Sequence, residues 1–406
     1  MLTREENELL SRVGPGTGMG EFMRRFWVPA LRARNLVADG PPMGVRLLGQ
    51  NLVAFRATDG RIGILDEGCP HRGVSLTLAR NADCALQCIF HGWKIDVSGK
   101  IVDIPTEPAE RGDAFAARVK INHYPAREAA GIVWVWLGGG EPAAFPAFEF
   151  TSLPDSHVGS RLGIIHSSWL NGMEGQLDSA HVGILHQDWV DQFPGQRADL
   201  EKAAYDLSPR FEFEDQPYGY REAAVRNTPD GSHYVRVREF ALPWYSFIPS
   251  TGGRDSVHLV AMSIPIDDEH SAQWDVFYNP VRPLAIPNNP ESGQDPDDLA
   301  RGMGGIETRF GQSRQRMKDG SFSGFSVLRH EDYAVAMGQG VFADRTKEFL
   351  GSSDVPIVRA RRLMLDAVRR HAEGEARDFG AAADWRRIRA FADVIPKEMD
   401  WRAVPR

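Results

Sequence analysis

The chain has 406 residues, of which 42% are hydrophobic and 25% are charged, and its formal net charge is −8 at pH 7. This composition excludes a disordered chain, and the negative charge argues against general affinity for nucleic acid or an anionic membrane. A chain of this length is expected to form two or three domains.

The sequence indicates neither a membrane span nor a secretion signal. No apolar run approaches the roughly 20 residues of a transmembrane helix. The first residues, MLTREENELLSRVG, are acidic where a signal peptide has a basic start and an apolar stretch. Only three cysteines occur, which fits a reducing compartment. We therefore expect a cytoplasmic protein.

In chain order, the pattern divides the sequence into three parts. Residues 1–40 contain apolar residues at helical spacing and predict a helical lead-in. Residues 41–140 contain short runs such as NLVAFRA and GIVWVWLG between Gly, Asp and Asn turns, and predict an all-β domain. Residues 141–406 contain longer alternating runs, including SHYVRVREFALPWYSFIP, which predict an antiparallel sheet with one covered face.

Two later stretches differ from these strands. Residues 287–305 are rich in Pro, Asn, Asp and Gly and predict a mobile loop, which would act either as a lid or as a simple connection. Residues 356–392 have helical spacing and many arginines, and predict a surface helix.

The stretch 69–93 carries the strongest chemical signal. Cys69 and His71 form one pair, and Cys88 and His91 form a second pair, with sixteen residues between His71 and Cys88. Each pair sets a thiolate and an imidazole on a short loop, which suits a cluster of two irons, one held by the sulfurs and one by the nitrogens. Zinc also binds two Cys and two His, but a zinc finger usually keeps its cysteines in one pair and its histidines in the other. The mixed pairs therefore favour an iron–sulfur cluster.

CPHRG and CIFHGW, the two segments that contain these pairs, resemble the Rieske [2Fe-2S] signature. Respiratory Rieske proteins carry a further cysteine near each loop and join the two in a disulfide. Val74 and Phe90 stand at those places here. The domain is therefore similar to the Rieske domain of oxygenases.

A second polar motif, NGMEGQLDSAHVGILH, occupies residues 171–186. On a continuous helix, four of its polar residues would share one face: Asn171, Glu174, Asp178 and His181. A polar stripe in an apolar context must be solvated, paired or bound to metal. His181 and His186 would point about 140° apart on a regular helix. Gly183 between them permits a break that would let both imidazoles reach one ion.

Two histidines leave a metal short of ligands. A carboxylate from elsewhere would complete the two-His-one-carboxylate triad of a non-haem iron(II) oxygenase, which leaves positions open for O2 and substrate. Four acidic residues after the predicted loop are candidates: Glu331, Asp332, Asp344 and Asp354. Spacing alone does not choose among them.

Residues 171–186 resemble the mononuclear-iron motif of Rieske non-haem iron oxygenase alpha subunits. HEDYAV and DRTKEFLGSSD resemble the carboxy-terminal region of the phthalate-dioxygenase branch, and similar segments cover nearly the whole chain, including HGWKIDVSGKIVDIPTEP and YPAREAAGIVWVWLG. The resemblance implies an α+β fold, in which an all-β Rieske domain precedes a helix-grip catalytic domain. It also makes Asp332 the third iron ligand.

Asp178 is the candidate for a connection between the two metal sites. A carboxylate that hydrogen-bonds the outer nitrogen of His181 would fix the tautomer of that ring. In the family, the corresponding Asp bridges the two metals between chains of a head-to-tail trimer. The resemblance therefore implies a contact between Asp178 and His91 of the partner subunit, and a homotrimer or a multiple of trimers. The alternative is a carboxylate that only supports His181 or faces solvent.

The sequence offers no site of its own for a nicotinamide or a flavin, because no G-x-G-x-x-G motif opens a βαβ unit. The resemblance implies that a separate NADH-dependent reductase, with flavin and a ferredoxin-type cluster, supplies the electrons.

Four arginines in two alternating runs are candidates for substrate binding: Arg221, Arg226, Arg236 and Arg238. An inward-facing arginine would suit a carboxylate held bidentately. Alternatively, these arginines face solvent and pair with Glu201, Glu222 or Glu239.

Aromatic carboxylates are common substrates in the family, so the resemblance implies ring cis-dihydroxylation of a phthalate-like acid or substituted benzoate. The alternatives are monooxygenation or O-demethylation of a methoxylated aromatic acid, a Rieske electron carrier, and a module that only binds an apolar ligand. An electron carrier or a binding module would leave the second motif unexplained.

Overall fold

The computed structural model of the chain describes residues 1–192, 198–249, 256–285, 295, 297–375 and 383–404. The chain divides into two compact units. The larger unit comprises Met1–Val13, Thr17–Met19 and Pro146–Arg406, and the smaller comprises Gly14–Gly16 and Gly20–Phe145. The predicted lead-in, residues 1–40, is not a separate part. Its first helix, α1 (Arg4–Ser11), belongs to the larger unit, and its strand β1 (Trp27–Arg32) belongs to the smaller unit.

The smaller unit is built from three antiparallel sheets, as the short alternating runs predicted. The first contains β1, β10 (Ile132–Trp136) and β9 (Ala126–Ala129), and the second contains β2 (Met43–Leu47), β3 (Gln50–Arg56) and β4 (Ile62–Asp66). The third contains β5 (Arg80–Ala82), β6 (Ala85–Gln87), β7 (Lys94–Asp96) and β8 (Ile101–Asp103), and helix α3 (Ala109–Ala116) follows it. Cys69 and Cys88 are buried in a core that also contains Phe55, Leu86 and Trp93.

Within the described residues, the larger unit contains one antiparallel sheet, which confirms the predicted α+β class. Its strands follow the order β11 (Val158–Ile165), β17 (Ser271–Tyr278), β16 (His258–Pro265), β15 (Tyr245–Ile248), β14 (His233–Ala241), β13 (Gly219–Asn227) and β12 (Arg210–Gln216). An eighth strand, β18 (Phe391–Ile395), pairs with β14. The register of β13 and β14 sets Arg221 opposite Glu239 and Glu222 opposite Arg238, so opposite charges support it.

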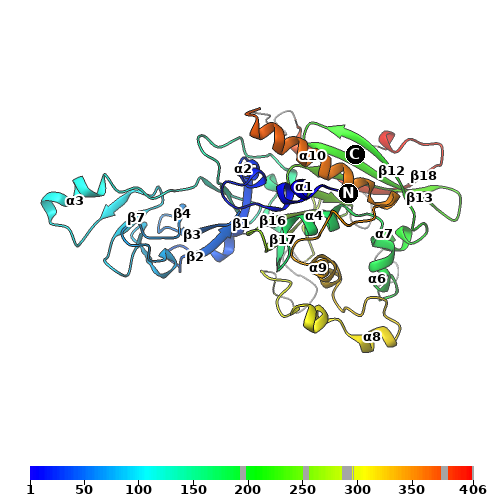
Figure 1. Cartoon of the computed structure of the whole chain (residues 1–406), viewed down its shortest axis with the longest axis horizontal. Coiled ribbons are helices and arrows are strands. Elements are labelled where there is room, and N and C mark those ends of the chain that lie inside the picture. Colours follow the sequence, from blue (N-terminus) through cyan, green and yellow to red (C-terminus); the bar gives the residue numbers. More distant parts are fainter. Residues whose placement is uncertain (193–197, 250–255, 286–294, 296, 376–382, 405–406) are drawn as a thin grey trace. The chain divides into compact units, whose positions relative to one another are not determined.

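Helix α4 (Trp169–Leu177) lies at the centre of the larger unit. It packs against β15, β16 and β17 on one side, and helices α9 (Leu328–Gly338) and α10 (Val355–Ala372) pack against it, while α1 packs against α10 (Figure 1). The remaining helices are α2 (Gly18–Met23), α5 (Val182–Leu185), α6 (Gln187–Gln192), α7 (Ala198–Ala203) and α8 (Arg314–Lys318). None of the helices in the described ranges is both long and apolar enough to cross a membrane.

Two expectations about the later chain need comment. The helix predicted for residues 356–392 is too long, because α10 ends at Ala372 and Phe391–Ile395 forms strand β18. Gly374, with φ of +81°, follows the end of α10, where a left-handed residue commonly terminates a helix. Residues 287–294 and 296 of the loop predicted for residues 287–305 lie outside the described residues.

A buried group of charges holds α4 in place. Glu174, on α4, accepts hydrogen bonds from Arg345 Nη2 at 2.9 Å and from Arg361 Nε at 2.6 Å. Arg345 also donates to Asn171 Oδ1, and Arg361 donates to both carboxylate oxygens of Glu348. Burial raises the pKa of Glu174, but the two guanidinium charges outweigh it and lower the pKa below the usual value.

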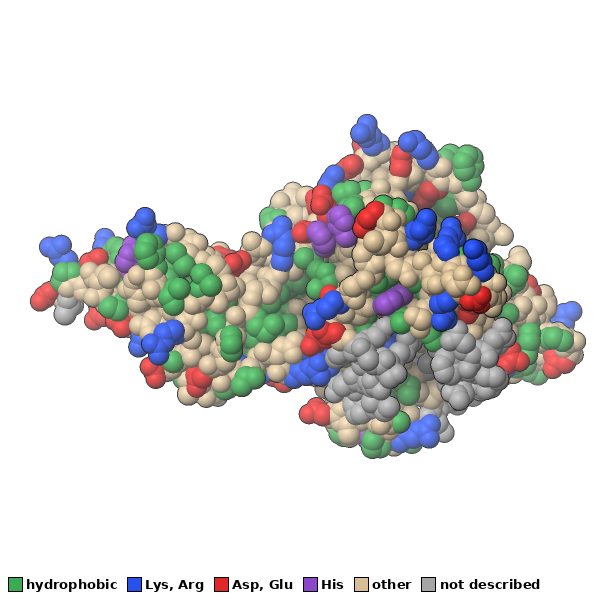
Figure 2. Space-filling model, turned by 90° about the horizontal axis from the view of Figure 1, so that it is seen from below, with side chains coloured by type: hydrophobic (Ala, Val, Ile, Leu, Met, Phe, Trp, Pro, Cys, Tyr) green, Lys and Arg blue, Asp and Glu red, His purple; other side chains and the backbone are tan. Residues whose placement is uncertain are grey.

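We expect Arg345→Met to destabilise the protein by about 3 kcal/mol, because removing one member of a buried ion pair leaves the other charge poorly compensated. On the face shown in Figure 2, acidic and basic side chains are interspersed over the surface, and such exposed pairs contribute only about 0–1 kcal/mol. Arg301, with 69% of its side chain exposed, is the matched control. Urea unfolding would measure both changes. Equal urea midpoints for Arg345→Met and Arg301→Met would show that the buried ion pair of Arg345 and Glu174 does not stabilise the fold more than an exposed pair does.

Candidate metal centres

The two loops of the smaller unit that carry the Cys/His pairs have the same backbone geometry. The N–H of Gly73 donates to Cys69 O at 2.8 Å, and the N–H of Gly92 donates to Cys88 O at 2.9 Å. Both glycines have positive φ, +74° and +79°, which favours glycine at these two turns. The sequence therefore forms two equivalent loops.

The loops bury the two cysteine side chains more deeply than the two histidine rings. Both cysteines are 4% exposed, and both are free thiols. The rings of His71 and His91 lie nearer the surface with their centroids 4.6 Å apart, and His71 stacks on Trp93. Burial, with a smaller effect of the neighbouring Cys88, raises the pKa of the Cys69 thiol to about 11.

These four residues fit a cluster with one Cys-bound and one His-bound iron. Among the described residues, His91 Nδ1 is buried and has no hydrogen-bond partner. A buried nitrogen without a partner is costly, and a metal ligand bond would satisfy it.

The second motif folds differently from the continuous helix that the sequence predicted. Helix α4 ends at Leu177, and Asp178 adopts an extended conformation at its C-terminus. Asp178 Oδ1 accepts hydrogen bonds from the N–H groups of Ala180 and His181, which turns the chain before α5 begins at Val182.

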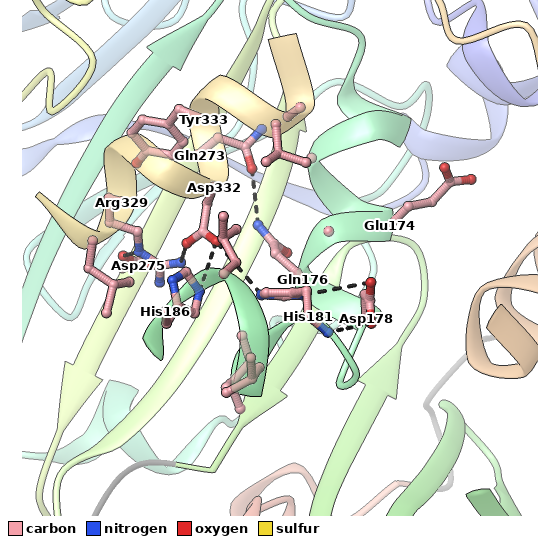
Figure 3. Close-up of a pocket in the computed structure, with 18 of the residues that line it drawn as sticks. Glu174, Gln176, Asp178, His181, His186, Gln273, Asp275, Arg329, Asp332 and Tyr333 are labelled. Carbon is pink, nitrogen blue, oxygen red and sulfur yellow. Dashed lines mark hydrogen bonds and ion pairs between the residues drawn. The ribbon is translucent and has the colours of Figure 1, made fainter. Parts of the chain in front are cut away.

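The predicted polar stripe is therefore divided. Asn171 and Glu174 belong to the buried charge group around Arg345, and Figure 3 shows Glu174 pointing away from the two histidines. The expectation that they share a face with Asp178 and His181 was wrong, because the helix stops before those two residues.

His181, His186 and Asp332 come together at one point in the larger unit, with one ligand atom from each within 4.8 Å of the others. Asp332 Oδ1, from α9, lies 3.2 Å from His186 Nε2 and 3.8 Å from His181 Nε2 (Figure 3). Two ligands that bind an ion at about 2.1 Å and at right angles lie about 3 Å apart. The pair His186 and Asp332 matches this spacing, and His181 lies somewhat further out.

Two of the acidic candidates, Asp344 and Asp354, have other partners. Asp344 is half exposed and pairs with Lys347 at 2.8 Å. Asp354 Oδ2 accepts the N–H of Gly351 at 2.7 Å. Of the four acidic candidates, Asp332 is the one that the structure brings to both histidines.

Glu331 has a role that the sequence did not reveal. It is fully buried, and its Oε2 accepts hydrogen bonds from His186 Nδ1 at 2.6 Å and Trp189 Nε1 at 3.1 Å. Its other oxygen accepts the hydroxyl of Ser323. Glu331 thus fixes the ring so that Nε2 faces Asp332, which is how carboxylates commonly orient metal-binding histidines.

The charges around the site shift the pKa values of His186 and Asp332 in opposite directions. Burial lowers the pKa of His186, but the carboxylates of Asp332 and Glu331 outweigh it and raise it to about 9. Burial raises the pKa of Asp332, but His186, Arg329 and His181 lower it well below the usual range. Such opposed shifts are typical of functional sites.

Asp178 lies beside His181, with Oδ2 at 3.7 Å from Nδ1. This distance is longer than a hydrogen bond. The predicted hydrogen bond to the outer nitrogen of His181 is therefore not formed in this structure, although the two groups lie close together. Burial raises the pKa of Asp178, but the neighbouring His181 and the N–H groups that it accepts lower it to about 2. Asp178 is therefore an anion next to the histidine.

A cavity of about 1020 Å³ opens beside these residues. Its lining includes His181, His186, Asp332, Arg236 and Arg238, together with apolar side chains such as Leu259 and Phe277. A concave, largely apolar site with a few convergent polar groups is typical of small-molecule binding.

The four candidate arginines have different positions. Arg221 lies on the sheet face opposite the cavity, where it pairs with Glu239 and stacks over Trp401. Arg226 is on the cavity face, but it is fully buried and donates to backbone carbonyls of Asp206 and Ser179. The prediction of substrate binding was therefore wrong for Arg221, and Arg226 does not line the cavity. The alternative was right about two pairs, since Arg221 pairs with Glu239 and Arg238 pairs with Glu222. It was wrong about solvent, because all four arginines are buried.

Comparison with known proteins agrees with this architecture. The family described as Rieske [2Fe-2S] domain matches residues 26–125, and the one described as LigXa C-terminal domain like matches residues 135–405. The chain is 37% identical to phthalate 4,5-dioxygenase oxygenase subunit of Pseudomonas putida, over 99% of this chain and 94% of that one. It is 31% identical to 3-chlorobenzoate-3,4-dioxygenase oxygenase subunit of Comamonas testosteroni, over 100% and 98% of the two chains.

The fold is also that of a solved structure, the terminal oxygenase of carbazole 1,9a-dioxygenase from Nocardioides aromaticivorans. The TM-score is 0.60 at 20% identity, over 90% of this chain and 97% of that one. Fold and sites thus define an oxygenase with a Rieske domain. The chain belongs to the Rieske non-haem iron oxygenases, in the phthalate-dioxygenase-like branch, and its cofactors are a Rieske [2Fe-2S] cluster and a mononuclear iron.

We expect Glu331→Gln to lower the affinity of the larger unit for iron(II) by about 10–100-fold, because His186 loses the carboxylate that orients its ring. The content of the cluster should not change. Anaerobic equilibrium dialysis would measure the affinity, and visible circular dichroism would measure the cluster. Glu307→Gln, at an exposed position, is the matched control. Unchanged iron affinity in Glu331→Gln would show that this contact does not orient the ligand.

Proposed function

We propose that the chain is the terminal oxygenase component of a two-part system acting on an aromatic carboxylate. The proposed reaction is ring cis-dihydroxylation of a phthalate-like acid or substituted benzoate. Substrate, O2, two electrons and two protons together give a cis-dihydrodiol. The observation that supports an acidic substrate is the positive charge on one wall of the cavity that contains the triad.

That positive charge comes from Arg236 and Arg238, which line the cavity. The register of β13 and β14 sets Arg226 on the same face of the sheet, where it is buried outside the cavity lining. Burial and the charge of Arg236, with a smaller effect of Arg238, lower the pKa of Arg226 to about 10. This shift reflects burial first and repulsion among the guanidinium groups second, and both are costly. An anionic substrate group bound at the cavity wall would offset the repulsion.

Arg236 is the residue to which we assign the substrate carboxylate. Arg238 pairs with Glu222 at 2.7 Å and donates to the carbonyls of Gln176 and Leu177 at the end of α4. Arg236 reaches the cavity with Nη1 at 3.5 Å from Ser179 Oγ and Nη2 at 3.5 Å from Pro249 O. A guanidinium in this position can bind a carboxylate through two parallel hydrogen bonds.

Cys69, His71, Cys88 and His91 are the proposed cluster ligands, and His181, His186 and Asp332 are the proposed ligands of the mononuclear iron. When bound, the two groups supply the electrons and the activation of O2. The chain contributes the apolar cavity wall that limits water, the arginine that orients the acid, and the carboxylates that orient the ligands.

Asp178 is proposed to connect the two metal sites between subunits. It is an anion at the surface of the site, 3.7 Å from His181 Nδ1 and 29% exposed, so it has room for a second partner. We propose His91 of the partner subunit as that partner, in a homotrimer or a multiple of trimers. A separate NADH-dependent reductase with flavin and a ferredoxin-type cluster would deliver the electrons, and the protein is proposed to be cytoplasmic.

We expect Asp178→Asn to retain both metals while the reoxidation of the cluster becomes slower. The amide has one acceptor oxygen and no negative charge, so it cannot accept a hydrogen bond from each histidine through separate oxygens as a carboxylate can. Single-turnover stopped-flow absorbance of the reduced protein with substrate and O2 would measure the rate, and iron analysis would measure the metals. An unchanged rate of cluster reoxidation would refute the bridging role.

The substrate is tested by turnover with a phthalate-type reductase, NADH and a panel of aromatic acids that includes methoxylated ones, with product analysis by mass spectrometry. A product that has gained O2 and two hydrogens would establish dihydroxylation. Release of formaldehyde would instead identify O-demethylation, which the same triad can support. Reduction of the cluster without turnover of any compound would favour an electron carrier.

We expect Arg236→Gln to lower kcat/KM for the acid by about 10–100-fold, because the loss of a charged hydrogen bond costs about 1.5–3 kcal/mol. Turnover of the neutral amide of the same acid should not fall in parallel. Arg210→Gln, with 63% of the side chain exposed on β12 of the same sheet, is the matched control. Equal losses for acid and amide would place the carboxylate elsewhere.

A further inference from the structure

A row of four alternating charges runs along the cavity wall beside the triad. Arg161 comes from β11, Asp275 from β17, and Arg329 and Asp332 from α9, and all four line the cavity. Figure 3 shows Arg329 between Asp275 and Asp332. The row ends at the carboxylate that faces His181 and His186.

Asp275 holds Arg329 by two parallel hydrogen bonds. Arg329 Nε donates to Asp275 Oδ2 at 2.8 Å, and Nη2 donates to Oδ1 at 2.6 Å. Arg161 Nε donates to Asp275 Oδ2 as well, at 3.0 Å. The side chains of Asp275 and Arg329 are 5% and 13% exposed. A planar guanidinium bound at two points in a nearly buried site has one orientation.

That orientation directs the third nitrogen of Arg329 at Asp332. Arg329 Nη1 donates to Asp332 Oδ2 at 3.0 Å. The other oxygen, Oδ1, is the atom that lies 3.2 Å from His186 Nε2 and 3.8 Å from His181 Nε2. The two oxygens of one carboxylate thus have separate partners.

We propose that Arg329 is a positioning residue that reserves Oδ2 of Asp332, so that the carboxylate offers only Oδ1 to the iron. This inference rests on the proposed triad. Carboxylates bind metals through either one or two oxygens, and a second oxygen would occupy a position that an open oxygenase site needs for other ligands. The negative charge of Asp275 offsets the guanidinium, which limits its repulsion of a nearby cation.

A purely structural role for Arg329 would have a different consequence. Its contacts also join α9 to β17, so its loss would lower stability whether or not it controls the carboxylate. The number of oxygens that Asp332 supplies is the property that separates the two roles. It is measured by near-infrared magnetic circular dichroism of the iron(II) centre, with the cluster kept oxidised and without substrate.

We expect Arg329→Gln to retain its mononuclear iron while the ligand-field bands shift to those of a centre with one more protein oxygen. Arg329→Lys should restore the original bands in part, because an ammonium can still donate to Oδ2. Asp275→Asn, which keeps the shape but removes the charge that holds Arg329, should shift the bands in the same direction by less. Arg301→Gln, at an exposed position, should leave them unchanged.

Unaltered bands in Arg329→Gln would overturn the proposal. Loss of mononuclear iron with an intact cluster would also overturn it, because Arg329 would then hold Asp332 at the ion rather than restrict it. If Arg329→Gln does not fold, the bands of Asp275→Asn decide in the same way. Full iron retention in Asp332→Ala would show instead that the triad, and with it the proposed site, is wrong.

Discussion

The site depends on where helix α4 ends. Arg238 donates to the carbonyls of Gln176 and Leu177, the last residues of α4, and the carboxylate of Asp178 accepts the N–H groups that follow. The backbone polar groups on both sides of the helix end therefore have hydrogen-bond partners. A helix that continued for another turn would carry His181 to a different face. At the middle of α4, Glu174 is bound by two buried arginines, which prevents the helix from sliding on the sheet. The histidines are placed by a helix fixed along its length.

Around that fixed end, each candidate iron ligand has a charged group on the side away from the ion. Glu331 contacts His186 Nδ1, Asp178 approaches His181 Nδ1, and Arg329 contacts Asp332 Oδ2. In each case the remaining atom, Nε2 or Oδ1, faces the common point. Two of these three partners lie on α9, and this helix also carries Asp332, so one rigid helix supplies a ligand and the groups that orient two ligands. Such an arrangement lowers the cost of ordering the side chains when an ion binds.

The sequence was sufficient where the determining contacts are local. The cluster loops follow from Cys and His spacing, and the sheet follows from strand alternation, because both patterns act over a few residues. The role of Glu174 could not be predicted, since its partner Arg345 lies 171 residues away. The same holds for Glu331 and Asp332. These neighbours on one helix point about 100° apart, and only the position of His186 between them shows that one orients the ring while the other faces the ion. Their assignment therefore needed the packing of α9.

The four arginines show how a sheet divides one residue type among several tasks. Alternation places Arg221 on the far face, where Glu239 and Trp401 use its charge for packing, and places the other three on the cavity face. On that face, Arg226 and Arg238 bind the backbone of the segment between α4 and β12 and the end of α4. These two residues therefore shape the wall, while Arg236 contributes its charge to the cavity itself. Under the proposed function, selection of an acid over a neutral aromatic compound depends on the charge of Arg236 at the cavity wall, where an anionic group offsets the cost of burying several guanidinium groups on one face.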